Sequence, residues 1–205
     1  GKRSIISVIP ISKATTSSSN LATVSLENIQ FEKIYMYSDE ITIDENYHSN
    51  VLIYEHSLAT KFFSLNSVVY SVLPTALNVK NSTFKSVFGS SIFLMGRSED
   101  LKKADLNSTV NFTNLSFSDN SAFFGTALTV LPKSYDPNIT ITNCTFIKNR
   151  ALDTGTLTIY NSFLTVQDSN FTESKAIIGP AIYMGGKTII NNLFKNNNYE
   201  DSISH

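Results

Sequence analysis

The chain has 205 residues, a formal net charge of −1 and only 16% charged residues. This length is sufficient for one domain with a hydrophobic core, and the near-neutral charge argues against a basic surface for nucleic acid or an anionic membrane. Every apolar run falls well short of the roughly 20 residues that a membrane-spanning helix needs.

Residues 1–23 precede the regular part of the sequence. The stretch SIISVIPIS predicts a first, capping strand, and KATTSSSN is typical of a flexible polar linker. The chain begins at Gly1 without a signal-peptide pattern, which favours a mature or trimmed product. We therefore expect an N-terminal strand and linker at 1–23, a repetitive domain at 24–198 and a C-terminal tail at 199–205.

From residue 24 onward, one eight-residue pattern recurs six times. Its copies are VSLENIQF, LNVKNSTF, VNFTNLSF, ITITNCTF, LTVQDSNF and KTIINNLF. The alternation of apolar and polar residues at the start of each copy predicts a strand with one buried face. The last position is always Phe, at Phe31, Phe84, Phe117, Phe146, Phe171 and Phe194. The fifth is Asn or Asp, at Asn28, Asn81, Asn114, Asn143, Asp168 and Asn191.

A second block follows the better-preserved copies of the pattern. Eight residues after Phe117, Phe146 and Phe171 come GTALTV, TGTLTI and GPAIYM. The stretch FSLNSVVYSVLP from Phe63 resembles the sequence that begins at Phe117, so we expect a seventh, eroded repeat between Phe31 and Phe84. The Phe-to-Phe spacings then run from about 21 to about 33 residues, which is typical of solenoids.

These repeats predict an all-β fold, a parallel β-helix solenoid of about seven coils. One coil of ~25 residues cannot bury its apolar face alone, whereas stacked coils pair their strands in parallel about 4.8 Å apart. Stacking would align the Phe residues in an internal aromatic ladder. It would also align the Asn residues in a ladder of inward amides at a tight bend, because Asn tolerates positive φ.

The spacing F-x-x-N occurs four times, at Phe63/Asn66, Phe117/Asn120, Phe146/Asn149 and Phe194/Asn197. Together with GTAL, TGTL and GPAI, this pattern resembles the right-handed parallel β-helix of the pectate-lyase-like superfamily. Within it, the repeats are similar to those of polymorphic outer-membrane proteins and related eukaryotic surface proteins, which pair F-x-x-N with a GGA[IL]-like motif. The resemblance implies right-handed coils and an extracellular or cell-surface location, but it does not specify a function.

Seven N-x-[ST] sequons are typical of N-glycosylation in a secreted protein, although an Asn-, Ser- and Thr-rich chain produces several by chance. Three of them belong to the predicted Asn ladder, where an inward amide could not carry a glycan. The better candidates are Asn107, Asn111, Asn138 and Asn170. Asn107 and Asn138 are favoured because they end variable loops.

Cys144 is the sole cysteine, so no internal disulfide can form. It shares the sixth position of the pattern with Ile29 and Leu115, which favours a buried thiol over an interchain disulfide or a nucleophile. Tyr160, Tyr183, Phe123 and Phe124 fall at outward or turn positions. They favour either a surface for ligands such as sugars or simple turn packing.

Enzymes on the fold that the sequence resembles act on acidic polysaccharides through clustered carboxylates. Here the acidic pairs do not recur from coil to coil, and Asp119, Asp153 and Glu173 lie near the second turn in different registers. The three histidines show no metal-ligand spacing. We therefore expect neither catalysis nor a cofactor, and a polysaccharide lyase or hydrolase is the least favoured interpretation.

Neither end of the repeat carries an amphipathic helix that would cover a terminal coil. Either the chain is part of a larger protein, or its ends pack on neighbouring copies and propagate a filament. The first functional hypothesis is therefore a structural glycoprotein that forms a surface layer or filament by self-association. The second is an adhesin or carbohydrate-binding module, whose variable loops 39–54 and 95–108 recognise glycans or other surface proteins.

Overall fold

The structure is a computed structural model. It describes residues 4–8, 23–34, 67–73, 76–96, 108–131, 137–186, 189–190 and 203–204. Within these ranges the chain forms strands, bends and turns but no helix. The composition accounts for this, because β-branched and aromatic residues favour strands while Asn and Ser favour the bends between them.

Four parallel sheets contain all the strands. Sheet 1 consists of β1 (Ser4–Val8), β4 (Ser67–Leu73), β7 (Ser90–Gly96), β11 (Leu128–Leu131), β15 (Leu157–Tyr160) and β19 (Ile182–Gly185). Sheet 2 consists of β2 (Thr23–Glu27), β5 (Ala76–Lys80), β8 (Thr109–Thr113), β12 (Asn138–Thr142), β16 (Phe163–Gln167) and β20 (Ile189–Ile190). Sheet 3 consists of β3 (Gln30–Glu32), β6 (Thr83–Lys85), β9 (Ser116–Ser118), β13 (Thr145–Ile147) and β17 (Asn170–Thr172). Sheet 4 consists of β10 (Ser121–Ala122), β14 (Arg150–Ala151), β18 (Lys175–Ala176) and β21 (Ile203–Ser204).

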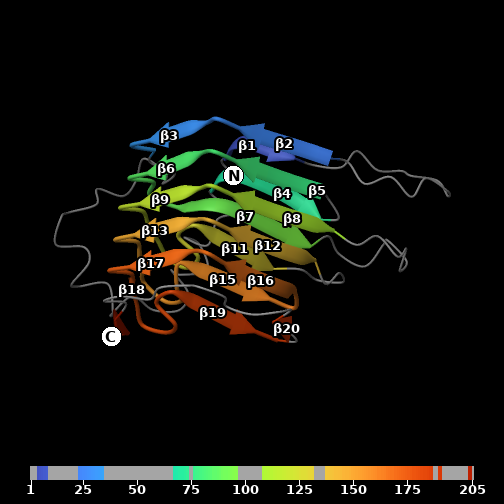
Figure 1. Cartoon of the computed structure of the whole chain (residues 1–205). Helices are drawn as coiled ribbons and strands as arrows, with labels where there is room; N and C mark the ends of the chain where they lie inside the picture. The colour runs from blue at the N-terminus through green and yellow to red at the C-terminus, as the bar shows by residue number, and fades with distance from the viewer. Residues whose placement is uncertain are drawn as a thin grey trace.

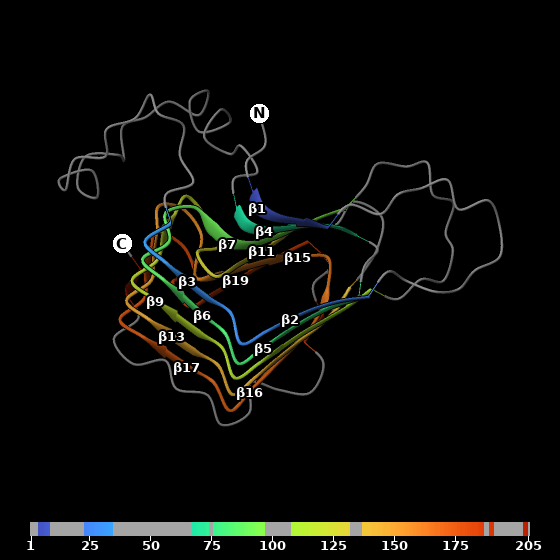
Figure 2. The ribbon, with the colours of Figure 1, turned by 90° about the horizontal axis from the view of Figure 1, so that it is seen from above.

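The chain visits the sheets in a fixed order, so each circuit lies on the one before it (Figure 1). A strand of sheet 2 leads into sheet 3, then through sheet 4 in the later circuits, and finally into sheet 1. Viewed from above, sheets 1, 2 and 3 form the three sides of the coil, with a sharp bend between sheets 2 and 3 (Figure 2). This arrangement is a solenoid of stacked parallel strands, compatible with the predicted parallel β-helix.

The coils stack in the register that the sequence pattern predicts. In β12, Ile139 and Ile141 are buried while Thr140 between them is half-buried, and each pairs with its counterpart in the strands on either side. Because like positions align over successive coils, the apolar face of each strand packs into one continuous core.

An internal ladder of phenylalanine rings runs through sheet 3, as predicted. Four ring contacts connect the five described members: Phe31–Phe84 at 5.1 Å, Phe84–Phe117 at 4.8 Å, Phe117–Phe146 at 5.2 Å and Phe146–Phe171 at 4.4 Å between centroids. The last three pairs are within 11° of parallel. Burial of one such side chain contributes on the order of 2–3 kcal/mol, and ring contact adds about 1 kcal/mol. The sixth predicted member, Phe194, lies outside the described residues.

Two columns of residues adopt positive φ where the coil turns. The first is the predicted Asn column at the bend between sheets 2 and 3, with φ between 48° and 58°: Asn28, Asn81, Asn114, Asn143 and Asp168. The second follows sheet 3, with φ between 51° and 54°: Lys33, Ser86, Asp119, Lys148 and Glu173. The first column was predictable because Asn favours this conformation. The second was not, because Lys, Ser and Glu have no such preference.

The predicted seventh repeat between Phe31 and Phe84 is wrong. Phe31 pairs directly with Phe84 in β3 and β6, and β2 pairs directly with β5, so no coil separates them. Among the described residues, sheets 1 and 2 contain six strands each. The stretch interpreted as an eroded repeat supplies β4, which continues in sheet 1 the coil begun by β2 and β3. Phe63 and Asn66 lie outside the described residues.

The two ends of the chain contribute strands to the sheets. β1, the predicted capping strand, pairs with β4 at the edge of sheet 1, and Ile6 packs against the core. β21 pairs with β18 in sheet 4. Short segments within 1–23 and 199–205 are therefore part of the stacked sheets.

Candidate functional site

Hydrogen-bonded amides form a ladder on the outside of the bend between sheets 2 and 3. The Nδ2 of Asn143 donates to Oδ1 of Asn114 (2.8 Å), Asn114 donates to Asn81 (3.0 Å), and Asn81 donates to a carboxylate oxygen of Glu27 (3.4 Å). The ladder was predicted, but its predicted inward direction is wrong, because Asn81, Asn114 and Asn143 are all exposed. The positive-φ bend turns these side chains outward while their backbone N–H groups bond the next coil. Asn191 lies outside the described residues.

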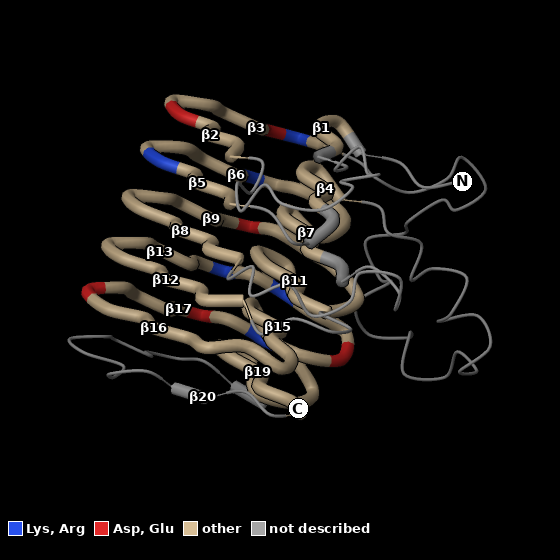
Figure 3. The backbone as a smooth tube through the Cα atoms, turned by 90° about the vertical axis from the view of Figure 1, so that its right-hand side faces the viewer, with Lys and Arg blue, Asp and Glu red and all other residues tan. Residues whose placement is uncertain are grey.

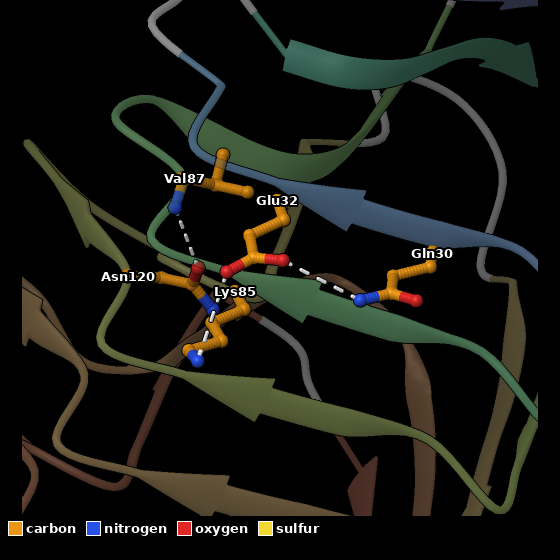
Figure 4. A network of polar contacts seen from close by, with 5 residues as sticks. All are labelled: Gln30, Glu32, Lys85, Val87 and Asn120. Atoms are coloured by element: carbon orange, nitrogen blue, oxygen red, sulfur yellow. Dashed lines mark hydrogen bonds and ion pairs between the residues drawn. The ribbon is translucent and has the colours of Figure 1, made fainter.

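A different pair of asparagines points inward and connects each coil to its predecessor. Asn120 and Asn149 are the last residues of two F-x-x-N motifs, and both are fully buried. Asn120 accepts the Val87 N–H (2.9 Å) and donates to the Phe84 carbonyl (3.0 Å), and Figure 4 shows Asn120 and Val87 together. In the same way, Asn149 accepts a hydrogen bond from the Asn120 N–H (3.2 Å) and donates one to the Phe117 carbonyl (3.0 Å). The motif therefore satisfies backbone groups that would otherwise be buried without a partner.

Cys144 lies in the core, as predicted. It is fully buried, and its thiol donates to the Thr142 carbonyl (3.3 Å). Burial raises the pKa of the thiol to about 11. A buried, protonated thiol is neither an effective nucleophile nor accessible for a disulfide.

The glycosylation candidates are distributed over sheets 2 and 3. Asn138 begins β12 and is half-buried, whereas Asn170 begins β17 and is exposed. Asn111 is half-buried in the middle of β8, and its Nδ2 donates to Oδ1 of Asn78 at 2.9 Å. Asn107 lies outside the described residues. Since the ladder amides are exposed, burial does not exclude Asn81, Asn114 and Asn143 as glycan carriers.

Three carboxylates considered for catalysis do not form a cluster. Asp119 and Glu173 occupy the same column, contrary to the registers expected, with Lys148 of the intervening coil between them. The Nζ of Lys148 lies 4.0 Å from Glu173, and both side chains are about half exposed. Asp153 lies at another bend, just before β15.

The remaining charges are spread over several coils (Figure 3). The second ion pair connects Lys85 and Glu32 (3.7 Å) across neighbouring coils, close to the Gln30–Glu32 contact drawn in Figure 4. Within the described ranges, no group of three or more His, Cys, Asp or Glu residues could hold a metal ion. In the same part of the chain, no helix is long and apolar enough to cross a membrane.

The end of the stack formed by the edge strands β1, β2 and β3 leaves part of the core half-buried. In β2, Val24 and Leu26 are half-buried, whereas the residues stacked on them, Leu77 and Val79, are fully buried. Phe31 remains 9% exposed, whereas the next four rings of the ladder are 0% exposed. Among the described strands, none pairs with the outer edge of β1, β2 or β3. We call this surface the open first coil.

Aromatic residues outside the core form two close pairs. Phe123 and Phe124 are half-buried in the bend after β10, with centroids 5.8 Å apart. Tyr160 and Tyr183 lie on neighbouring strands of sheet 1, with centroids 5.7 Å apart. The variable loops 39–54 and 95–108 were predicted to recognise ligands. All of 39–54 and residues 97–107 of the second loop lie outside the described residues.

Comparison with known proteins identifies no relative of this chain. No protein-family model matches the chain, and searches of curated proteins and of solved structures gave no match either. The assignment to parallel stacked sheets therefore depends on strand register, burial and ring stacking alone.

Proposed function

We propose that this chain is a non-catalytic, extracellular structural protein whose coils stack end to end to build a surface layer or filament. The open first coil is the observation that supports the proposal. It presents half-buried apolar side chains and the outer edges of three parallel strands, a combination that proteins normally cover. A second copy stacked on this end would continue the core, the phenylalanine ladder and the sheets.

Head-to-tail stacking fits these edges better than a closed dimer. Every pair of neighbouring strands is parallel, so one edge of a coil carries the backbone groups that complement the opposite edge of the next coil. A two-fold dimer would bring two identical edges together in antiparallel orientation. Contact between unlike ends does not close and therefore propagates into a filament.

The finer features of the proposal follow the sequence. We take the coils to be right-handed, as in the pectate-lyase-like superfamily, in agreement with the strong preference for right-handed crossovers between parallel strands. The sequons at Asn111, Asn138 and Asn170 would carry glycans on the sides of the rod, and Asn107 is a fourth candidate. Glycans there would leave the ends free for assembly.

A lysine placed on the open first coil should disperse the assembly. Val24→Lys puts a charge where the proposed neighbour packs, whereas Ser25→Lys adds the same charge at the adjacent, exposed position of β2. We expect wild type and Ser25→Lys to form ordered polymers by electron microscopy and sedimentation, and Val24→Lys to remain small. Circular dichroism should show the same β content in all three proteins.

Two outcomes would contradict this proposal. The first is a wild-type protein that sediments as a monomer under native conditions at every concentration tested. The second is a polymer that Val24→Lys and Ser25→Lys weaken equally, because the contact would then lie on the side of the rod.

A further inference from the structure

The outer face of sheet 1 carries an aromatic corner, formed by Tyr160 and Tyr183. In β15, Leu157 and Ile159 point into the core, so Tyr160 points outward. Tyr183 of the neighbouring β19 aligns with Thr158 and therefore shares this face. Both side chains are half-buried, their centroids are 5.7 Å apart, and their planes meet at 61°. The two rings form adjoining walls instead of one flat platform.

Gly185 determines where the first wall stands. It pairs with Tyr160 across the strands, and a Cβ added to it would overlap with the Cδ1 and Cε1 atoms of the Tyr160 ring. The ring therefore lies across the glycine, in space that any other residue would fill. A substitution at Gly185 would displace this wall without changing either tyrosine.

The corner lies within reach of one negative charge, that of Asp153. Burial raises the pKa of Tyr160 to about 12, with further contributions from the Tyr183 hydroxyl and from the negative charge of Asp153. Asp153 is half-buried in the bend before β15, and it forms no ion pair with any lysine or arginine of the described residues. The faces of aromatic rings carry negative charge density as well. The corner therefore combines two π systems with a carboxylate that has no cationic partner in the described chain.

We propose that this corner binds an organic cation, a quaternary or methylated ammonium group, against the two tyrosine rings and near Asp153. Such groups are weakly hydrated and are held by angled aromatic walls through cation–π attraction, which a nearby carboxylate strengthens. A sugar ring favours a single flat aromatic surface, which the 61° angle between these rings does not provide. The two rings lie on the outer face of sheet 1, on its last two strands.

Choline and its uncharged isostere 3,3-dimethylbutan-1-ol test the proposal directly, because the two probes have the same shape. The chain contains nine tyrosines and no tryptophan, so ring signals of 13C-labelled tyrosine can be followed by NMR and assigned with Tyr183→Phe. We expect choline to shift the Tyr160 and Tyr183 signals at millimolar concentration and to bind about three- to tenfold more tightly than the isostere. Methyl glucoside should cause no shift.

Three variants separate the parts of the site. Asp153→Asn should reduce the preference for choline over the isostere several-fold, whereas Asp119→Asn, at another bend, should leave it unchanged. Gly185→Ala should weaken choline binding by displacing the Tyr160 ring, with the spectrum of the core unaltered. Equal binding of choline and isostere, stronger binding of the glucoside, or no shift at 100 mM choline would each overturn the proposal.

Discussion

At the scale of single residues, asparagine has two separate roles in this fold. In the exposed ladder it turns the chain through positive φ and bonds its neighbours in contact with water. In the F-x-x-N motif it is buried and satisfies an N–H and a carbonyl of the preceding coil. Water can replace the first set of hydrogen bonds but not the second, so the two roles should differ in their contribution to stability.

Replacement of Asn149 by alanine should therefore lower the free energy of unfolding much more than the same change at Asn143. Asn149→Ala leaves the Asn120 N–H and the Phe117 carbonyl buried without these partners, at a cost of about 2–4 kcal/mol. Asn143→Ala loses an exposed hydrogen bond and a favourable αL residue, about 1 kcal/mol. Urea denaturation measures both free energies of unfolding. Equal losses would show that the buried amide has no special role.

Cys144 occupies a column in which serine also occurs. Ser82 and Ser169 donate to carbonyls two residues earlier (2.7 and 2.9 Å). Each also accepts a hydrogen bond from a backbone N–H of the preceding coil (3.1 Å each). Cys144→Ser should make the same local bond to Thr142, at a cost below about 1 kcal/mol. In the same column, Leu115→Ser removes buried methyl groups and should cost about 2–5 kcal/mol.

Because of the Cys144 thiol, we also expect wild type and Cys144→Ser to differ in stability in alkaline solution. Burial raises the pKa of the thiol to about 11 in the folded chain, against 9.0 for an unperturbed thiol, so the folded state keeps the proton to higher pH. Wild type should therefore lose stability relative to Cys144→Ser as the pH rises from 9 to 11, by up to about 2 kcal/mol. Urea titrations at several pH values measure this. Parallel profiles for the two proteins would exclude a raised thiol pKa.

At the scale of elements, register is the feature that connects sequence to packing. Thr113 pairs with Thr142, and the residues after them, Asn114 and Asn143, begin equivalent bends. A circuit of the chain from 114 to 142 is therefore one complete structural unit. Strand side chains alternate between two faces, so a shift of one residue would move core residues to the surface.

Removal of one circuit should preserve the fold only when register is kept. Deletion of 114–142 joins Thr113 to Asn143, so strand, bend and phenylalanine column should realign; we expect native β content and a lower free energy of unfolding. Deletion of 114–141, one residue shorter, should disrupt the following coils because it shifts their register by one residue. Circular dichroism and protease resistance distinguish the two. Equal folding of both variants would contradict stacking in register.

At the scale of the whole molecule, the ends of the stack and its sides have different properties. The sides expose polar strands, the amide ladder and the aromatic corner, whereas the open first coil exposes part of the core and strand edges. This difference is the reason for placing self-association at the end and ligand recognition at the side. The lysine experiment probes β2, and the choline experiment probes β15 and β19, so each proposal has its own readout.

Much of this architecture was predictable because each coil repeats the chemistry of its neighbour. Recurring Phe and alternating apolar residues predicted the buried ladder and the parallel strands, since only stacked coils can bury such faces. The same approach failed between Phe31 and Phe84. A long interval between two repeats is compatible with one coil that carries an insertion and also with two complete coils. Only the strand pairing distinguishes these two cases.

The sequence by itself determined the periodicity, the strand faces and the positions of the asparagine bends, because these depend on local preference and on alternation. Tertiary structure decided which asparagines are buried, that Asp119 and Glu173 share a column, and that Tyr160 lies across Gly185. Each of these is a contact between residues of different coils or a direction imposed by a bend. Such properties depend on how far one circuit advances along the stack, which residue identity alone does not specify.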